Sequence, residues 1–441
     1  MTHLLPQPLI SRLKQLDITT LTTIQTKTIP HILDNKDLLV SSPTSSGKTL
    51  AFALPLYIKT NPNSKDIRTL ILSPTRELAL QIQEQFKAIS YADGIKIATL
   101  YGGVGIQESL NQLKAQPQII IATPGRLIDL INKELIYISS VDKFVLDEAD
   151  RMLDMGFFDD IVYISSKLKS NRQTMLFSAT YPQKIKELSS KILQKPIEII
   201  NDELISIEQI AHLVTNRYEA LKRVLLHYHD TLSIIFCNTK DSVIELSKQL
   251  QNDGFECVEF HGNLSQEERI ESIKLFANQT KPIMIATDLA SRGLDIVEVD
   301  LVIHYDMASN KEIYTHRIGR TSRQDKVGKA ITLYNKYQKD AISYLSQQME
   351  DRDLPQDSST QIKINRYTLY IKGGKKDKLR KGDIVGTLCK EVGIESSSIL
   401  QIDIEPTITY IALSKDTLPL LKNLSHIKIK KRKFKLFCQN I

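Results

Sequence analysis

TLILSPTRELALQIQEQFKAI, residues 69–89, joins a strand-like run to a helix-like run and indicates the fold class. Residues 69–74 are rich in Leu and Ile, as in parallel strands that are buried on both faces. The residues after Arg76 place apolar side chains at helical spacing. Because a buried strand followed directly by a helix is the repeating unit of α/β proteins, the stretch predicts a doubly wound sheet.

The same alternation recurs in two sets along the chain. The first set adds the strand-like runs IKIATLYGG, QIIIATP, KFVLDEAD and QTMLFSAT, which end at residue 180. After a break near residue 205 the second set gives SIIFCNT, ECVEFHG, PIMIATD, DLVIHYD and KAITLYN, which end at residue 335. We therefore predict two α/β lobes, at residues 1–205 and 206–350.

Composition limits the class of protein. A chain of 441 residues with 41% apolar residues can bury more than one core. It has no apolar run of the roughly 18–20 residues that span a bilayer and no segment resembling a signal peptide. Its four cysteines lack metal-ligand spacing, which favours free thiols in a reducing cytosol. We expect a cytoplasmic protein without membrane contact.

Charge is distributed unevenly. Residues 362–441 hold 14 Lys and 3 Arg against 7 acidic residues, a net charge of +10, whereas the whole chain carries +7. The polar, proline-containing segment 351–361 precedes this region and reads as a linker. A basic terminal module on a near-neutral body indicates a domain that binds a polyanion, and the alternative is a lysine-rich solubilising surface.

A candidate phosphate loop follows the strand-like run at residues 37–40. Its sequence, SSPTSSGKTL at residues 41–50, ends in Gly-Lys-Thr but has Ser42 where the phosphate-loop template has Gly. Lys48 would reach the β- and γ-phosphates of a nucleotide, and the Thr49 hydroxyl would coordinate Mg²⁺. Backbone amides of the loop would face the phosphates. The loop residues are Thr44, Ser45, Ser46 and Gly47.

Two acidic residues follow a later strand. Asp147 closes the apolar run of KFVLDEAD, where an acid can hold Mg²⁺ beside a phosphate loop, and Glu148 can deprotonate an attacking water. Alone, the four residues 147–150 would read as a solvated acidic turn. With Gly-Lys-Thr upstream, the catalytic interpretation is favoured.

The segment HRIGRTSR, residues 316–323, supplies cations in the second lobe. Arg320 and Arg323 can act as arginine fingers on the γ-phosphate. His316 and Arg317 can link that site to the rest of the interface. For any one of these residues, a basic helix face that pairs with acids is a reasonable alternative.

Together these segments resemble a known family. The order SSGKT, PTRELA, GG, TPGR, DEAD, SAT, HG…QxxR, ATDLASRGLD and HRIGRTSR is similar to that of the DEAD-box RNA helicases, over residues 1 to about 345. Departures are Ser42, Ser45 and Ser322, and no aromatic residue precedes Phe52. The resemblance implies two RecA-like lobes that close on ATP and single-stranded RNA, with RNA-stimulated ATP hydrolysis and local duplex opening.

The resemblance also implies roles for individual residues. Gln25 would read adenine, Asp295 would contact the ribose, and Ser178 and Thr180 would couple the two lobes. RNA would lie along residues at the strand ends of both lobes. In the first lobe these are Pro74, Thr75, Arg76, Gly102, Gly103, Thr123, Pro124, Gly125 and Arg126, and in the second Gly262, Gln266, Arg269, Thr287, Asp288 and Arg292.

Residues 362–441 predict a smaller α+β domain. Four strands and two helices in the order βαββαβ indicate an RRM-like sandwich, without an evident aromatic stacking motif. The segment GGKKDKLRKGDIVG resembles the RNA-binding domain of DbpA-type helicases, whose target is a hairpin of large-subunit (23S) ribosomal RNA. This implies a monomeric factor acting on the pre-ribosomal large subunit. Candidate RNA contacts are Lys372, Lys375, Lys376, Lys378, Arg380 and Lys381, followed by Lys428, Lys430, Lys431, Arg432 and Lys433.

Two alternatives remain open at the level of sequence. One is an ATP-gated RNA clamp that turns over slowly, against which the presence of Glu148, Arg320 and Arg323 argues. The other is a general RNA chaperone or decay helicase with relaxed targeting.

Overall fold

The computed structural model of the chain describes residues 4–42, 46–90, 94–200, 207–288, 299–321, 327–346, 348–356, 364–421 and 424–438. The described residues form two compact units, one ending at residue 200 and one beginning at residue 207. Among the helices within these ranges, none combines the length and apolar character that a membrane span requires.

The first unit, here called lobe 1, is built on a parallel sheet of seven strands in the order β3-β4-β2-β5-β6-β1-β7. The strands are β1 (Leu38–Ser41), β2 (Thr69–Leu72), β3 (Ile97–Leu100), β4 (Ile119–Ala122), β5 (Lys143–Leu146), β6 (Gln173–Ser178) and β7 (Ile197–Ile200). The helices are α1 (Gln7–Gln15), α2 (Thr23–Leu33), α3 (Lys48–Lys59), α4 (Arg76–Ile89), α5 (Ile106–Leu113), α6 (Pro124–Asn132), α7 (Ala149–Asp154), α8 (Phe158–Ser166) and α9 (Gln183–Ile192).

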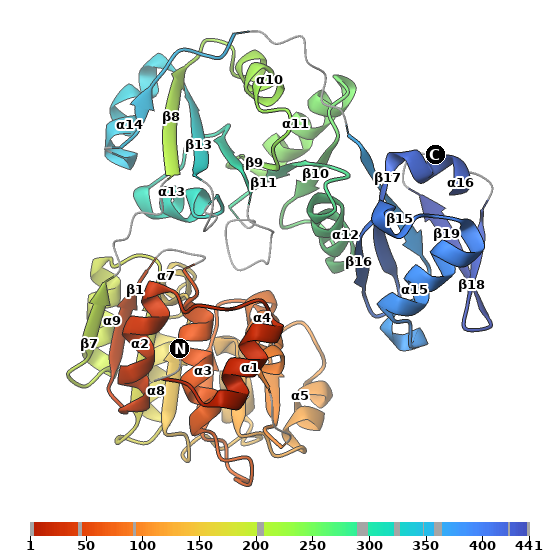
Figure 1. Cartoon of the computed structure of the whole chain (residues 1–441). Coiled ribbons are helices and arrows are strands. Elements are labelled where there is room, and N and C mark those ends of the chain that lie inside the picture. The colour runs from red at the N-terminus through yellow and green to blue at the C-terminus, as the bar shows by residue number, and fades with distance from the viewer. Residues whose placement is uncertain are drawn as a thin grey trace. The chain divides into compact units, whose positions relative to one another are not determined.

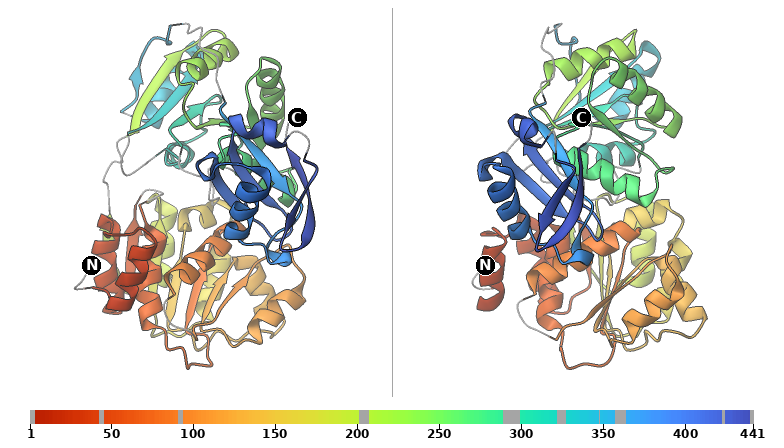
Figure 2. Two further views of the ribbon diagram at one scale, coloured as in Figure 1. Left: turned by 45° about the vertical axis from the view of Figure 1, so that its right-hand side comes forward. Right: turned by 90° about the vertical axis from the view of Figure 1, so that its right-hand side faces the viewer.

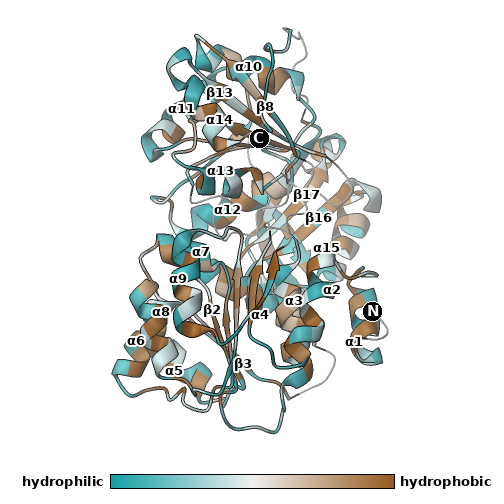
Figure 3. Ribbon diagram, turned by 90° about the vertical axis from the view of Figure 1, so that its left-hand side faces the viewer, coloured by the Kyte–Doolittle hydropathy of each residue, from teal (hydrophilic) through white to brown (hydrophobic). Residues whose placement is uncertain are grey.

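Both faces of this sheet are buried, which explains the continuous apolar runs of its strands. In β1, Leu38 and Val40 join the core on one face, and Leu39 joins the core on the other. Helices α1 to α4 cover the first face and α5 to α9 the second, with the apolar strands between them (Figure 3). All the strand ends that follow apolar runs therefore lie along one edge of the sheet.

The second unit begins with lobe 2, whose sheet has the order β10-β11-β9-β12-β13-β8-β14 and is parallel throughout. Its strands are β8 (Ile207–Leu213), β9 (Ser233–Phe236), β10 (Cys257–Phe260), β11 (Ile283–Ala286), β12 (Leu301–His304), β13 (Gly328–Tyr334) and β14 (Glu350–Asp351). Its helices are α10 (Arg217–His227), α11 (Lys240–Asn252), α12 (Gln266–Ala277), α13 (Lys311–Ile318) and α14 (Lys339–Leu345) (Figure 1).

The C-terminal domain of the second unit is an antiparallel sheet of five strands in the order β16-β17-β15-β19-β18. The strands are β15 (Arg366–Ile371), β16 (Ile399–Ile404), β17 (Thr409–Ser414), β18 (His426–Ile429) and β19 (Arg432–Cys438). Helix α15 (Lys381–Thr387) lies on one face of this sheet, as the views of Figure 2 show, and the short α16 (Leu418–Leu421) packs into the same core.

The predicted fold class is confirmed: two doubly wound parallel sheets and a small α+β domain. One detail was wrong, because the lysine-rich end forms a hairpin of two strands, β18 and β19, where the sequence indicated one. Lys430 and Lys431 make its turn with φ of 51° and 68°. The division at residues 205, 350 and 361 remains a prediction.

Candidate ATP and RNA sites

The phosphate-loop candidate ends in Gly47, which has a left-handed backbone conformation and is the N-cap of helix α3. Gly47 has a φ of 89°, and a Cβ there would lie 2.5 Å from Gln25 Nε2. Only glycine therefore allows the loop to pack against Gln25. Lys48, the first residue of α3, is buried, and its Nζ donates to the Ser42 carbonyl at 2.5 Å. Thr44 and Ser45 lie outside the described residues.

Gln25 is tied to this loop by hydrogen bonds. Its Nε2 donates to the Gly47 carbonyl at 3.1 Å, and its Oε1 accepts from the Thr22 amide at 3.0 Å. The Thr22 hydroxyl in turn donates to the Ser46 carbonyl at 2.9 Å. The side chain predicted to read adenine thus also contacts the loop that would hold the phosphates.

Asp147 and Glu148 follow β5 with different environments. Asp147 is 3% exposed, and burial, together with the charge of Glu148, raises its pKa to about 7 although Lys48 acts in the opposite direction. Glu148 has a φ of 51°, a conformation that costs a non-glycine residue about 1–3 kcal/mol. Its Oε2 accepts from Arg151 Nη1 at 3.0 Å. The general-base candidate Glu148 therefore has a strained backbone conformation, and its side chain is held by an ion pair with Arg151.

Asp150, which sequence reasoning left without a role, connects two motifs of lobe 1. Its Oδ2 accepts from the Ala179 amide at 3.1 Å, the Thr180 amide at 2.9 Å and the Thr180 hydroxyl at 2.8 Å. The Ser178 hydroxyl donates to the Thr180 carbonyl at 2.6 Å. The two residues predicted to couple the lobes are thus anchored to the acidic segment itself.

The RNA-contact candidates of lobe 1 follow three neighbouring strands, β3, β4 and β2. Thr75 caps α4, and the Arg76 guanidinium lies 4.7 Å from the centre of the Tyr101 ring. Arg126 of α6 donates to Ser109 Oγ at 3.1 Å and to the Val104 carbonyl at 2.5 Å. The structure also places Pro74, Gly102, Gly103, Thr123, Pro124 and Gly125 at this edge.

Glycines at this edge leave room for a ligand. Cβ atoms built on Gly102, Gly103 and Gly125 would meet no atom within 4 Å. Backbone that is this open allows close approach of another backbone, and helix N-termini favour anions. The edge can therefore accept an RNA phosphate chain without reading its bases.

In lobe 2 Arg317 is a buried hub. It is fully buried, and its Nε and Nη2 pair with the two carboxylate oxygens of Asp288 at 2.5 and 3.1 Å. It also donates to the Asp306 carbonyl and to Asn238 Oδ1. Asp288, predicted to contact RNA, is thus held by Arg317 after β11. These contacts give Arg317 a structural role within lobe 2, and its role as a link to the nucleotide site remains a prediction.

The remaining described candidates of lobe 2 lie just after strands or in and near the helices α12 and α13. Arg320 follows α13, and His316 within that helix is buried. Gly262 follows β10 and Thr287 follows β11, while Arg269 donates to the Gly262 carbonyl at 2.8 Å. Gln266 begins α12, which has a capping box made by Ser265 and Glu268. Arg292, Asp295 and Arg323 lie outside the described residues.

Helix α12 also contacts the C-terminal domain. Tyr370 Oη donates to Glu271 Oε1 at 2.8 Å, and Lys274 Nζ lies 3.4 Å from Asp403 Oδ1. Near the helix end, Asn278 Nδ2 donates to Thr368 Oγ1 at 3.2 Å. Helix α12 therefore begins with the RNA candidate Gln266 and contacts the C-terminal domain through its later turns.

The predicted basic loop of the C-terminal domain projects from the sheet. Lys372, Lys375, Lys376, Lys378, Arg380 and Lys381 are all exposed. The loop packs tightly through Gly374, where a Cβ would lie 2.1 Å from the Glu405 carbonyl oxygen. The Lys375 and Lys376 amides donate to the carbonyls of Glu405 and Pro406 at 2.8 and 2.9 Å. Its charged side chains are thereby free to face a polyanion.

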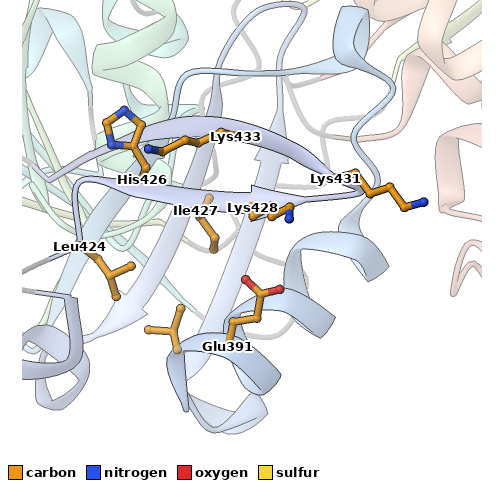
Figure 4. A pocket seen from close by; sticks show the side chains of 8 residues that line it. Glu391, Leu424, His426, Ile427, Lys428, Lys431 and Lys433 are labelled. Carbon is orange, nitrogen blue, oxygen red and sulfur yellow. The ribbon is translucent and has the colours of Figure 1, made fainter.

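A second basic feature surrounds the β18–β19 hairpin. A cavity of about 450 Å³ lies between the hairpin and the helical segment containing Glu391 and Val392. Figure 4 shows Lys428 and Lys431 on the hairpin, with Glu391 below Lys428 and Leu424 below His426. Lys433 and His426 complete the polar rim.

Comparison with known proteins agrees with this arrangement. The DEAD/DEAH box helicase family matches residues 22–188, the helicase conserved C-terminal domain matches residues 216–325, and the DbpA RNA binding domain matches residues 368–436. The solved structure of S. cerevisiae Dbp5 bound to RNA and ADP BeF3 is similar, with a TM-score of 0.71, 27% identity and coverage of 79% of this chain and 94% of that chain.

Two curated relatives match over almost the whole chain. ATP-dependent RNA helicase DbpA of Bacillus subtilis is 34% identical, covering 97% of this chain and 96% of its own length. ATP-dependent RNA helicase DbpA of Escherichia coli is 34% identical, covering 93% of this chain and 92% of its own length. The chain therefore belongs to the DEAD-box ATP-dependent RNA helicases of the DbpA type.

Proposed function

We propose that ATP is hydrolysed at the loop of lobe 1 and that RNA binding across both lobes controls this step. The observation that carries the proposal is that Lys48 Nζ contacts the Ser42 carbonyl of the loop, while the Lys48 charge acts to lower the pKa of the buried Asp147. Lys48 would exchange the Ser42 carbonyl for the β- and γ-phosphates, and the amides of residues 44–47 would cradle them. Because Gln25 donates a hydrogen bond to the Gly47 carbonyl, adenine binding at Gln25 would directly affect the conformation of the loop.

The residues fit a magnesium ion. Asp147 is a buried carboxylate with a raised pKa, so a nearby cation would stabilise its ionised form, and Thr49 adds a hydroxyl oxygen at the start of α3. Oxygen donors of this kind are the ones that Mg²⁺ prefers. When bound, the ion would neutralise charge on the phosphates.

Side chains of the protein would supply the general base and stabilise the charge that develops on the phosphate. Glu148 would take a proton from the attacking water once its ion pair with Arg151 loosens. Arg320 and Arg323 would approach the γ-phosphate and stabilise its developing charge, with His316 supporting them and Asp295 contacting the ribose. Through Asp150, the segment with Ser178 and Thr180 would carry the state of the nucleotide site to lobe 2.

We propose further that the target is a hairpin of large-subunit (23S) ribosomal RNA, which would make the protein a cytoplasmic assembly factor acting as a monomer. Support comes from the DbpA RNA binding domain and its exposed lysine loop. Counterion release by these lysines would make the affinity strongly dependent on salt.

A comparison of RNAs tests this target. ATP hydrolysis by the full chain is measured with the ribosomal hairpin and with a single strand of equal length and unrelated sequence. We expect the hairpin to stimulate far more strongly at equal concentration. Equal stimulation would contradict ribosomal targeting and favour a general RNA chaperone or decay helicase, and RNA binding with almost no turnover would favour an ATP-gated clamp.

A further inference from the structure

The helix-free face of the C-terminal sheet carries a row of aromatic rings. Antiparallel pairing sets Tyr410 opposite Tyr370 and Tyr370 opposite Phe437. The rings of Tyr370 and Phe437 stack with centres 4.7 Å apart and planes inclined by 15°, and Tyr410 lies 5.3 Å from Tyr370. Aromatic residues on this face of an RRM stack on RNA bases. The structure therefore has an aromatic row on this face that the sequence did not reveal.

Lobe 2 covers one half of this row. Tyr370 and Tyr410 are only 2% and 4% exposed, although both point away from the helices of their own domain. The Tyr370 hydroxyl is bonded to Glu271, and Lys274 pairs with Asp403, which stands opposite Tyr410. While this contact lasts, no base can stack on either tyrosine.

The other half of the face is open and basic. Along β19, Phe434 and Leu436 point into the core, whereas Lys433, Lys435 and Phe437 lie on the helix-free face. Phe437 is 40% exposed. On β18, His426 pairs with Lys435 and Lys428 pairs with Lys433, so both share that face. An exposed ring thus lies at the end of a basic row made by Lys435, Lys433 and Lys428.

The geometry of the ring decides where a ligand can bind. One face of Phe437 is taken by Tyr370, which comes from the neighbouring strand β15. Its other face is directed toward the edge strand β18. Lys435 lies two residues before Phe437 on the same strand, and Lys433, with Lys428 opposite it, lies two residues further along. A base placed there would extend the existing stack of Tyr370 and Phe437. Its nearest phosphate would lie beside Lys435, and the next phosphates along the RNA would lie toward Lys433 and Lys428.

We propose that Phe437 is a stacking site for one unpaired RNA base, and that Lys428, Lys433 and Lys435 bind the adjoining phosphates. The proposal rests on the proposed function in one respect, namely that RNA is the ligand of this domain. In this proposal the base stacks on β19 and not on the central strands β15 and β17, whose tyrosines are covered by lobe 2. Since every base has a π face, the site adds affinity with little sequence preference.

Fluorescence gives a direct test, because the chain has no tryptophan. Phe437→Trp places a single reporter in the site, and Tyr344→Trp places one on α14, where Tyr344 is 69% exposed. The full chain is titrated with a single-stranded oligoribonucleotide. We expect quenching of the Phe437→Trp signal at saturation and an unchanged signal from Tyr344→Trp. An unquenched Phe437→Trp protein that binds the RNA would overturn the proposal.

Affinity measurements complete the test. Phe437→Leu keeps apolar volume but removes the π face, so the dissociation constant should rise about 5-fold or more, and Phe437→Trp should restore it. Lys435→Ala should flatten the dependence of affinity on salt. Wild-type affinity in Phe437→Leu would refute this site while leaving the proposed function intact. Absence of RNA binding by the wild-type chain would instead refute both.

Discussion

Asp150 and Thr180 are joined by two hydrogen bonds to one carboxylate oxygen, from the Thr180 amide at 2.9 Å and from its hydroxyl at 2.8 Å. The first residue belongs to the acidic segment after β5 and the second to the turn after β6, on adjacent strands. A shift of the acidic segment on nucleotide binding would therefore move Thr180 with it. We propose this pair as the physical link between the proposed ATP site and Ser178 and Thr180, the residues expected to couple the lobes.

Replacing Asp150 should separate hydrolysis from unwinding. Asp150→Asn removes a buried charge that accepts from three donors in the segment 179–180, and hydrogen bonds to a charged group contribute about 1.5–3 kcal/mol. We expect lobe 1 to lose stability of that order, and duplex unwinding to fall more than ATP hydrolysis. Asp129→Asn, which breaks an exposed ion pair with Lys133, is the control and should cost under about 1 kcal/mol. Equal losses in both activities would contradict the link.

Lys48→Ala should abolish ATP turnover and leave RNA binding by the C-terminal domain intact. Lys48 is buried at the start of α3, and its Nζ reaches the Ser42 carbonyl of the loop, so the substitution removes the charge proposed to bind the phosphates. Steady-state hydrolysis and RNA filter binding measure the two properties. Lys87→Ala on α4, an exposed residue paired with Glu84, is the matched control. Substantial hydrolysis by Lys48→Ala would show that the phosphate loop is assigned wrongly.

Glu148→Gln should trap the enzyme on RNA. The amide cannot accept a proton from water, whereas its shape preserves nucleotide binding. With ATP present, RNA dissociation should slow by at least about tenfold relative to the wild type, and with ADP the two proteins should behave alike. Dissociation as fast as that of the wild type with ATP would argue against Glu148 as the base.

His304 should make lobe 2 sensitive to acid. Burial, together with the charge of Arg317, holds the pKa of His304 well below 6.5, and its Nδ1 lies 2.9 Å from Thr332 Oγ1. Because the unfolded chain binds a proton here that the folded one excludes, the stabilising contribution is complete above pH 6.5 and is lost as pH falls. The loss is up to about 1.4 kcal/mol per pH unit.

Urea unfolding at pH 7.0 and 5.5 checks this expectation. The wild type should lose more stability between the two values than His304→Asn, which has no titrating ring. Carboxylates and the other histidines are shared by the two proteins and cancel in the comparison. The same pH dependence in both would mean that His304 is protonated in the folded state.

The sequence was most informative for site residues that directly follow predicted strands. Strand ends along one sheet edge are implied by continuous apolar runs, and so Lys48 and Asp147 could be assigned to one site. The contacts of Asp150 with residues 179 and 180 were not predicted, because a sequence does not show in which direction a carboxylate points. Arg317 was associated with the nucleotide site, yet its complete burial against Asp288 is visible only in the structure.

The C-terminal domain shows the other limit. Tyr370, Tyr410 and Phe437 are far apart in sequence, and only antiparallel pairing brings them into one row. The β18–β19 hairpin was missed because its turn uses Lys430 and Lys431 at positive φ, where Asn and Gly are the usual residues. Contacts of α12 with Thr368 and Tyr370 carry no sequence signal, since those residues read as ordinary strand alternation.

The most direct test of the whole account is a crystal structure of the chain with RNA and a non-hydrolysable ATP analogue. We predict Lys48 Nζ, Arg320 and Arg323 within hydrogen-bonding distance of the phosphates, at about 2.7–3.2 Å. A bound analogue whose phosphates lie out of reach of Lys48, or a closed complex on RNA in which both arginines point away from them, would contradict it.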